Sequence, residues 1–244
     1  MIKFGTGGFR AIIGDEFTKA NLELLAQGLV HKMQDEHVEN TPLIIGYDRR
    51  FLSDIGAQWI SSVFAGNNIH VQFIDIEAPT PLIMFVVKKT GAKYGMAITA
   101  SHNPAEYNGV KVFTEGGRDA TKEVTNDLEG YISKVSDDQI RRMDFDEALK
   151  EGLVEVIEPM NDYIDSILSV IDIEKIKSKH VKVLLDPMFG VSKTSLQTIL
   201  LTCRCDVDVI NDRHDALFGG RLPSPSAKTL SRLSNMVVEG GYDL

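Results

Sequence analysis

The segment YGMAITASHNP, residues 94–104, joins a run of small apolar residues to a sequence that cannot continue a strand. Residues 94–99 are typical of a buried central β-strand, and Asn103-Pro104 ends it because proline has no N–H to donate. We therefore expect Ser101 on a short loop at the carboxyl end of this strand. Because ligands bind at that edge of an open α/β sheet, the segment predicts both the fold class and the place of the site.

Lys111 follows this loop at a short distance along the chain. Asn108-Gly109 is a hairpin signal, and the alternating run at 110–113 predicts a short strand that returns Lys111 toward Ser101. A cation beside a serine suits phosphate chemistry, because it offsets the negative charge of the group being moved. These residues therefore favour a phosphoryl-transfer site.

A structural and a hydrolytic interpretation of the serine loop compete with this one. Residues 101–104 are all of types common in turns, so the loop is open to a purely structural interpretation. A serine-hydrolase nucleophile elbow would need glycine at two positions where this sequence has Thr99 and Asn103. His102 is adjacent to Ser101 in sequence, which makes it a poor candidate for the base of its own neighbour.

Strands alternate with helices along the rest of the chain, which predicts mostly parallel sheets covered by helices on both faces. The predicted strands are 43–47, 69–76, 94–99, 184–186 and 205–210. The predicted helices follow Thr18 and Ser53, their expected N-caps, and also cover 82–89, 120–135, 191–201 and 227–238.

The same order of elements occurs twice, with Pro79-Thr80-Pro81 matched by Pro223-Ser224-Pro225. We expect tandem α/β/α domains at 1–150 and 151–244, with mixed, mostly parallel sheets. Residues 242–244 look like the start of another strand, so the second domain is expected to be incomplete. Asp186 ends a predicted strand and is a candidate to line a domain interface.

Composition limits the classes of function. The chain has 244 residues, 43% of them apolar, and a formal net charge of −9. The negative charge argues against nucleic-acid or acidic-membrane partners. No run approaches the roughly 20 apolar residues needed to cross a bilayer, and the first residues lack the apolar stretch of a secretory signal, so a cytoplasmic location is expected. An anion site would need a local cluster of cations, for which Arg10, Arg49, Arg50 and Lys111 are candidates. Cys203 and Cys205 are expected to be reduced thiols on one face of a strand. We expect no metal site at this pair, because the sequence has no other Cys and no His pair at ligand spacing.

Three motifs together resemble one family, the α-D-phosphohexomutases, which comprise phosphoglucomutases and phosphomannomutases. Residues 99–104 followed by Tyr-Asn-Gly-x-Lys at 107–111 resemble its active-site loop. Residues 4–14 resemble its opening Phe-Gly-Thr-Asp-Gly-x-Arg motif, with Gly7 in place of the usual Asp, and 218–225 resemble a Pro-x-Pro segment of its second domain. The chain is similar to the amino-terminal half of that family, ending before its metal-binding loop.

The resemblance implies an intramolecular phosphotransferase that interconverts sugar 1-phosphates and 6-phosphates. It implies a phosphorylated Ser101, with Arg10 and Lys111 binding the substrate and His102 in the catalytic loop. Mg²⁺ would coordinate the phosphoserine of Ser101, with its other ligands beyond residue 244, and a sugar bisphosphate would act as activator.

The resemblance leaves several alternatives open. A phosphoglucosamine mutase has nearly the same serine loop, and a truncated non-catalytic binding or structural module is the competing class. The hexose and the oligomeric state are not indicated by these residues. The 244-residue chain alone is expected to fold in its first domain and to show no mutase turnover.

Overall fold

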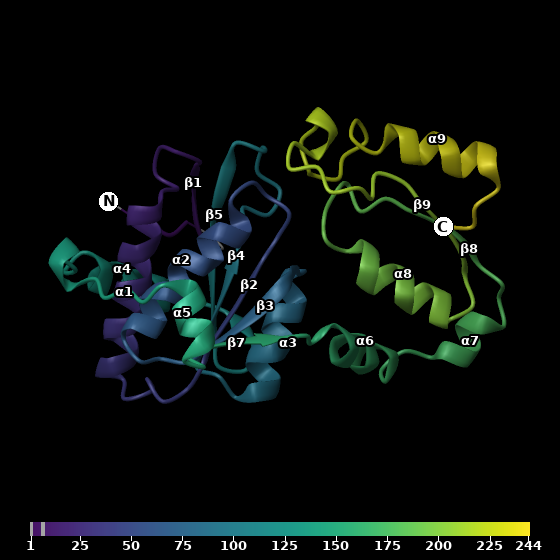
Figure 1. Ribbon diagram of the computed structural model, residues 1–244. Helices are drawn as coiled ribbons and strands as arrows, with labels where there is room; N and C mark the ends of the chain where they lie inside the picture. The colour runs from purple at the N-terminus through teal and green to yellow at the C-terminus, as the bar shows by residue number, and fades with distance from the viewer. Residues whose placement is uncertain (1, 6–7) are drawn as a thin grey trace. The chain divides into compact units, whose positions relative to one another are not determined.

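The structure, a computed structural model, describes residues 2–5 and 8–244 (Figure 1). The chain divides into two compact units. The first contains the chain up to Ala100 together with Glu106–Glu158, and the second contains Ser101–Ala105 and Pro159–Leu244. The short loop 101–105 therefore belongs to the second unit, although the strands on either side of it belong to the first.

The first unit is built on one mixed sheet of seven strands in the order β1-β5-β4-β2-β3-β7, with β6 paired to β5. The central pairs β2/β4 and β2/β3 are parallel, as is β3/β7, whereas β5 runs antiparallel to its neighbours. The strands are β1 (Phe9–Ile12), β2 (Leu43–Tyr47), β3 (Val71–Glu77), β4 (Tyr94–Ile98), β5 (Tyr107–Thr114), β6 (Arg118–Asp119) and β7 (Val154–Ile157).

Helices cover both faces of this sheet, which confirms the predicted α/β/α layers. Figure 1 shows α1, α2, α4 and α5 on one side of the strands and α3 on the other. Thr18 caps α1 as expected, by accepting a hydrogen bond from the Asn21 N–H. Among the described residues, no helix is both long and apolar enough to cross a membrane. The helices are α1 (Lys19–Asp35), α2 (Ser53–Gly66), α3 (Thr80–Thr90), α4 (Lys122–Ile132) and α5 (Phe145–Lys150), with the short 3-10 helix η1 (Asp137–Gln139) between the last two.

Strand β4 is the buried centre predicted from the sequence. All five of its residues are buried, and they continue the pattern of β2, which is buried along its whole length. Gly95 of β4 and Gly46 of β2 allow α3 to approach closely, because a Cβ at either position would overlap Val87 or Ile83 of that helix. Continuous burial on both faces explains why these strands read as apolar runs without alternation.

The hairpin expected at Asn108-Gly109 is wrong. Both residues lie inside β5 and are buried, and Gly109 pairs with Arg10 of β1. A Cβ on Gly109 would stand 2.1 Å from the carbonyl oxygen of Phe9, so only glycine lets β1 pair here. The local turn preference of Asn-Gly therefore gives way to a tertiary packing requirement.

The first unit extends beyond residue 150, where the sequence expectation placed the boundary. Strand β7 adds to the sheet in parallel with β3, with Val154 opposite Val71. Val154 is buried in the core between the sheet and its helices. This pairing is the reason that the division between the units falls after Glu158.

The second unit has a smaller sheet in which β8 (Lys182–Leu185) and β9 (Asp206–Val209) are parallel. The extended end of the chain lies along β8, since the Asp243 N–H donates to the Lys182 carbonyl and the Leu184 N–H donates to the Leu244 carbonyl. Figure 1 shows α9 on one side of these strands and α8 on the other. The remaining elements are α6 (Met160–Leu168), α7 (Ile173–Lys177), α8 (Lys193–Thr202), the 3-10 helix η2 (Phe218–Gly220) and α9 (Ser231–Gly240).

Cys203 and Cys205 do not share a strand, which corrects the sequence expectation. Cys203 is the C-cap of α8, and Cys205 precedes β9. Both thiols are free and buried, and both pack in the small core around Val183. Burial raises the pKa of the Cys205 thiol, which favours its protonated form.

Substitution of Gly109 by alanine is expected to destabilise the first unit by about 1–3 kcal/mol, because the new methyl group collides with the β1 backbone. Urea unfolding of the variant should show a lower midpoint. The control is Gly130→Ala in α4, where no heavy atom lies within 4 Å of the added Cβ. Since alanine favours a helix over glycine by roughly 0.5–1 kcal/mol, the control should be as stable as the wild type or more so. Equal midpoints for Gly109→Ala and the wild type would contradict this packing argument.

Candidate active site

Ser101 lies on an exposed loop that begins where β4 ends. The Thr99 N–H still donates to the Gly109 carbonyl at 3.0 Å, so pairing with β5 continues past the last residue of the strand. Ser101 itself has a φ of +55°, a left-handed conformation that is uncommon for a non-glycine residue. Such a conformation persists when the surrounding structure holds it, and it is found often at functional loops.

The imidazole of His102 lies within hydrogen-bonding reach of Ser101, with 3.3 Å between His102 Nδ1 and Ser101 Oγ. From the sequence alone this histidine is expected to be poorly placed, because it is the adjacent residue. Either atom can be the donor, depending on the tautomer of the ring.

Asp48, immediately after β2, fastens the start of the serine loop. Its Oδ2 accepts a 2.6 Å hydrogen bond from the Thr99 hydroxyl, two residues before Ser101. Its Oδ1 accepts from the Arg50 N–H and from the Ser53 hydroxyl, both at 2.9 Å. Its own N–H donates to the Ile98 carbonyl at 3.0 Å. The carboxylate thereby joins β2, β4 and the start of α2.

Arg50 and Asn108 hold the other end of the loop to the same cluster. The guanidinium of Arg50 donates to the Tyr107 carbonyl at 2.9 Å, and its Nε lies 3.5 Å from Asp48 Oδ2. The Asn108 amide donates to the Phe51 carbonyl at 3.1 Å and to the Ser53 hydroxyl at 2.9 Å. Both strands that flank the loop are therefore attached to the segment between β2 and α2.

Ser53 does not cap α2, contrary to the sequence expectation. The N-cap is Leu52, which has a φ of +62° and makes no side-chain cap. The Ser53 hydroxyl instead donates to Asp48 and accepts from Asn108. Because the Ser53 hydroxyl is bonded to Asp48 and Asn108, it does not accept a hydrogen bond from the N–H groups at the start of α2.

Burial sets the electrostatics of this cluster. It raises the pKa of the Asp48 carboxyl, while hydrogen bonds from Thr99 and the Arg50 N–H oppose that rise. It lowers the pKa of the Arg50 guanidinium, and the carboxylate of Asp48 opposes this change. The Arg50 side chain is 0% exposed, so its charge depends on the carboxylate beside it.

Arg10 and Lys111 are brought onto one face of the sheet. Arg10 pairs with Gly109 in the antiparallel register of β1 and β5, and Lys111 is two residues further along β5. Directly opposite residues and residues two apart on a strand point to the same face. The register between β1 and β5, which the sequence alone does not specify, therefore places both cations on the same face of the sheet.

The two cations differ in their partners. Lys111 Nζ lies 3.3 Å from Asp119 Oδ1, and the side chain is 19% exposed. Arg10 Nε is buried and forms no hydrogen bond within the described part of the chain. Gly8, with a φ of +131°, passes against the Lys111 stem, because a Cβ there would stand 3.2 Å from Lys111 Cγ.

Arg49 and Arg50 do not join Arg10 and Lys111 in an exposed basic patch, which corrects the sequence expectation. Arg50 is buried in the Asp48 cluster, and Arg49 Nε lies 3.7 Å from Glu77 Oε2.

The departure from the family pattern at Gly7 lies outside the described residues. Asp48 is not among the candidate residues expected from the sequence, because its contact with Thr99 joins positions 51 apart that no local pattern links.

Among the described residues, no group of three or more His, Cys, Asp or Glu side chains could hold a metal ion. Asp186, at the end of β8, is engaged within its own unit: it accepts from the Met188 N–H and the Asn211 amide, both at 2.8 Å. The side chains described here therefore do not by themselves make a Mg²⁺ site.

Comparison with known proteins agrees with this architecture. A family profile described as phosphoglucomutase/phosphomannomutase, alpha/beta/alpha domain I, matches residues 1–139, and the corresponding domain II profile matches residues 161–244. The chain belongs to the phosphoglucomutase/phosphomannomutase family. The resemblance seen in the three sequence motifs is thereby confirmed.

Individual relatives carry several activity names. A phosphoglucosamine/phosphogalactosamine mutase of Sulfurisphaera tokodaii is 31% identical over 242 residues, which cover 99% of this chain and 51% of that protein. A phosphoglucomutase of Staphylococcus saprophyticus is 32% identical over 213 residues, covering 82% of this chain and 37% of that protein. The chain thus spans about half, or less, of the length of these relatives.

A solved structure shows the same fold. The crystal structure of a putative phosphomannomutase from Thermus thermophilus superposes with a TM-score of 0.84 at 28% sequence identity, over 97% of this chain and 52% of that one. The fold of both units is therefore that of the amino-terminal part of a phosphohexomutase.

Replacing Asp48 by asparagine is expected to destabilise the first unit by roughly 3 kcal/mol, because it leaves the buried Arg50 charge without its carboxylate. The amide group would also face three donors. The loss is at the lower end of the range for buried pairs because the Asp48 side chain is 18% exposed. Urea unfolding measures the effect. Asp138→Asn, at an exposed aspartate in η1, is the matched control and should change stability by less than about 0.5 kcal/mol. A variant at Asp48 as stable as this control would contradict the anchoring role.

Proposed function

We propose that this chain supplies the phosphoserine-bearing part of a phosphohexomutase, an isomerase that moves a phosphoryl group within a hexose phosphate. The observation that carries the proposal is the position of Ser101, on a strained and exposed loop after β4 in a member of this family. The loop is attached at both ends to buried polar groups, which suits a side chain that must meet its reaction partner in a defined geometry.

The proposed reaction has two transfers. A substrate hydroxyl attacks the phosphorus of phosphorylated Ser101 and the bond to Ser101 Oγ breaks, so that a sugar bisphosphate forms while the proton of the attacking hydroxyl passes, through a base, to Ser101 Oγ. In the second transfer the Ser101 hydroxyl attacks the other phosphoryl group of the bisphosphate, and its proton passes to the sugar oxygen that leaves, which restores the phosphoserine and releases the isomeric monophosphate. Each step exchanges one P–O bond for another, so a sugar bisphosphate also suffices to load an unmodified serine.

Arg10 and Lys111 are proposed to bind phosphoryl oxygens. The paired strands β1 and β5 present both cations on one face, and the unsatisfied Nε of Arg10 needs an acceptor. Charge stabilisation of this kind is the main contribution a protein makes to phosphoryl transfer. His102, with its ring 3.3 Å from Ser101 Oγ, is proposed to orient that hydroxyl.

The family resemblance implies Mg²⁺, but the described residues do not fit a complete site. Ser101 would contribute one oxygen, and no cluster of carboxylates among the described residues accompanies it. We therefore derive no step through a metal from these side chains. The roles proposed for Arg10, Lys111 and His102 depend only on their own charges and positions.

The substrate class is proposed to be a hexose phosphate. A specific observation also favours an amino sugar phosphate: the relatives from Sulfurisphaera tokodaii, Methanobrevibacter smithii and Methanothermobacter thermautotrophicus, each matching 99% of this chain, are named as mutases of amino sugar phosphates. Loading Ser101 from glucose 1,6-bisphosphate and from glucosamine 1,6-bisphosphate in parallel distinguishes the two. The faster donor identifies the sugar.

Ser101 is expected to become phosphorylated when the protein is incubated with a sugar bisphosphate. Intact-mass and fragment spectra should locate one phosphate on this serine. Ser101→Ala should take up none, whereas Ser133→Ala, at an exposed serine after α4, should be loaded like the wild type. Phosphate on another residue in the wild type would refute the assignment of the nucleophile.

Lys111→Met is expected to slow this loading about 10²-fold or more, because a cation is removed while the stem that packs on Gly8 is kept. Single-turnover kinetics of phosphoserine formation provide the measurement. Lys122→Met, at an exposed position in α4, is the control with the same loss of charge. If both variants load at the same rate, Lys111 is only a surface charge paired with Asp119.

A further inference from the structure

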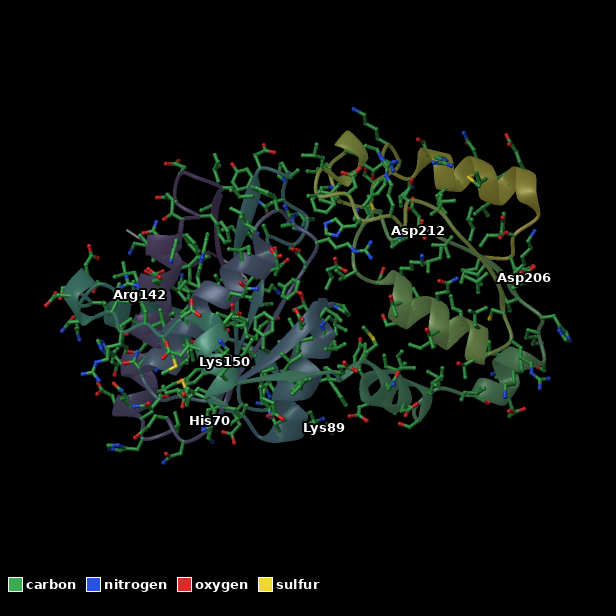
Figure 2. The ribbon with its side chains drawn as sticks, viewed as in Figure 1. His70, Lys89, Arg142, Lys150, Asp206 and Asp212 are labelled. Atoms are coloured by element: carbon green, nitrogen blue, oxygen red, sulfur yellow. The ribbon has the colours of Figure 1, made fainter. Side chains whose placement is uncertain are left out.

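The second unit contains a pocket of about 530 Å³ at the carboxyl edge of its two parallel strands. Its walls come from the loops that follow β8 and β9, from the η2 segment and from α9. Figure 2 labels Asp206, where β9 begins, and Asp212, on the loop beyond the end of β9. The pocket lies at the Asp212 end of the strand. The lining residues are Phe189, Asn211, Asp212, Arg213, Gly219, Arg221 and Arg232.

Three arginines converge on this pocket and outnumber its acids. Asp212 is the one acidic residue of the described lining, and it is already paired with Lys193 outside it. Arg213 lies 3.2 Å from Asp215 but is 74% exposed, so this pair is weak and screened by solvent. The pocket therefore has a positive excess in a chain whose net charge is −9.

Arg221 and Arg232 have no carboxylate partner within the described part of the chain. Arg221 donates to the Thr229 carbonyl at 3.1 Å, and Arg232 lies 3.5 Å from Asn211 Oδ1. Each guanidinium has five N–H donors, so these contacts leave most donors of both side chains unused. A planar fork of free donors is the group that recognises phosphate oxygens in pairs.

Phe189 holds two of the guanidiniums in place. Arg213 and Arg221 lie 5.7 and 5.6 Å from the centroid of its ring, within the range of cation–π attraction. Gly219 makes this arrangement possible, because a Cβ there would stand 2.6 Å from the Phe189 ring. Two like charges held beside one ring repel each other, and a bound oxyanion would relieve that repulsion.

The pocket loops are held in uncommon conformations. Phe189 and Asn211 both have left-handed backbones, with φ values of +62° and +53°, and the Phe189 N–H donates to the Asn211 carbonyl at 2.7 Å. Asp186 accepts from the Asn211 amide and so ties this loop to the end of β8. Strained loops joined in this way are preorganised, which lowers the entropic cost of ordering them when a ligand binds.

We propose that this pocket binds the phosphoryl group of a phosphorylated small molecule, with Arg213, Arg221 and Arg232 contacting its oxygens. A volume of about 530 Å³ falls in the range of small-molecule sites and exceeds what one inorganic anion fills. The ligand is therefore a phosphate monoester with an organic group. The proposal goes beyond the phosphoryl transfer at Ser101, since none of these residues has a role in that reaction.

Calorimetric titration of the 244-residue chain with glucose 1-phosphate at low salt tests the proposal. Saturable binding is expected, weakened about tenfold by Arg232→Gln and by Arg213→Gln, because each removes one charged hydrogen-bond donor. Arg204→Gln is the matched control: it is exposed and lies just before β9, away from the pocket loops, so it should leave the affinity unchanged. All variants should keep the wild-type unfolding transition, because these side chains are exposed or weakly bonded.

Two further titrations test the chemistry of the ligand and the independence of the pocket from Ser101. Inorganic phosphate is expected to bind more weakly than glucose 1-phosphate. If inorganic phosphate binds more tightly than glucose 1-phosphate, the monoester proposal is wrong. Ser101→Ala should bind glucose 1-phosphate like the wild type, so failure of the proposed transfer at Ser101 would not affect this result. The proposal is refuted if no saturation occurs by about 10 mM ligand, or if Arg232→Gln and Arg204→Gln bind equally well.

Discussion

The buried contact between Asp48 and Arg50 is the constraint on which the strand ends that flank the Ser101 loop depend. A charged pair taken out of water is tolerated only when its remaining hydrogen-bonding groups are satisfied. Here the Asp48 carboxylate accepts from Thr99 and Ser53, and the Arg50 guanidinium donates to Tyr107. Thr99 and Tyr107 stand on either side of the Ser101 loop. The requirement to satisfy two buried charges therefore also fixes both ends of the loop that carries the proposed nucleophile.

Strand β5 connects this cluster to the cations of the site. It begins at Tyr107, under the Arg50 guanidinium, and continues through Gly109, where β1 approaches, to Lys111. The close approach at Gly109 brings Arg10 onto the same face as Lys111. One strand thereby serves the loop anchor, the sheet core and the proposed phosphate contacts, so changes in its packing are expected to affect all three.

The turn after β8 in the second unit contains the same aspartate hydrogen bond as the turn after β2, but the side chains around it differ. Asp186 follows β8 and accepts from the N–H two residues later, as Asp48 does after β2. The residue at that position is Met188 instead of an arginine, so no buried ion pair forms there. The three arginines of the pocket come from the loop after β9, from the residue that follows η2 and from α9, where they face a pocket instead of the core. The same strand-end turn thus supports a structural anchor in one unit and an open basic site in the other.

The sequence alone determined the alternation of strands and helices, the burial of β4, the place of Ser101 after it and the family. These features follow from local pattern and composition, which act over a few residues. Tertiary structure decided the rest. Asn108-Gly109 became part of β5 because the Phe9 carbonyl of β1 leaves no room for a Cβ at Gly109, and Arg50 became buried because Asp48 and Tyr107 can satisfy it. Contacts between positions 48 and 99, or 50 and 107, exist only once the sheet order brings those strand ends together, and no periodicity along the chain encodes that meeting.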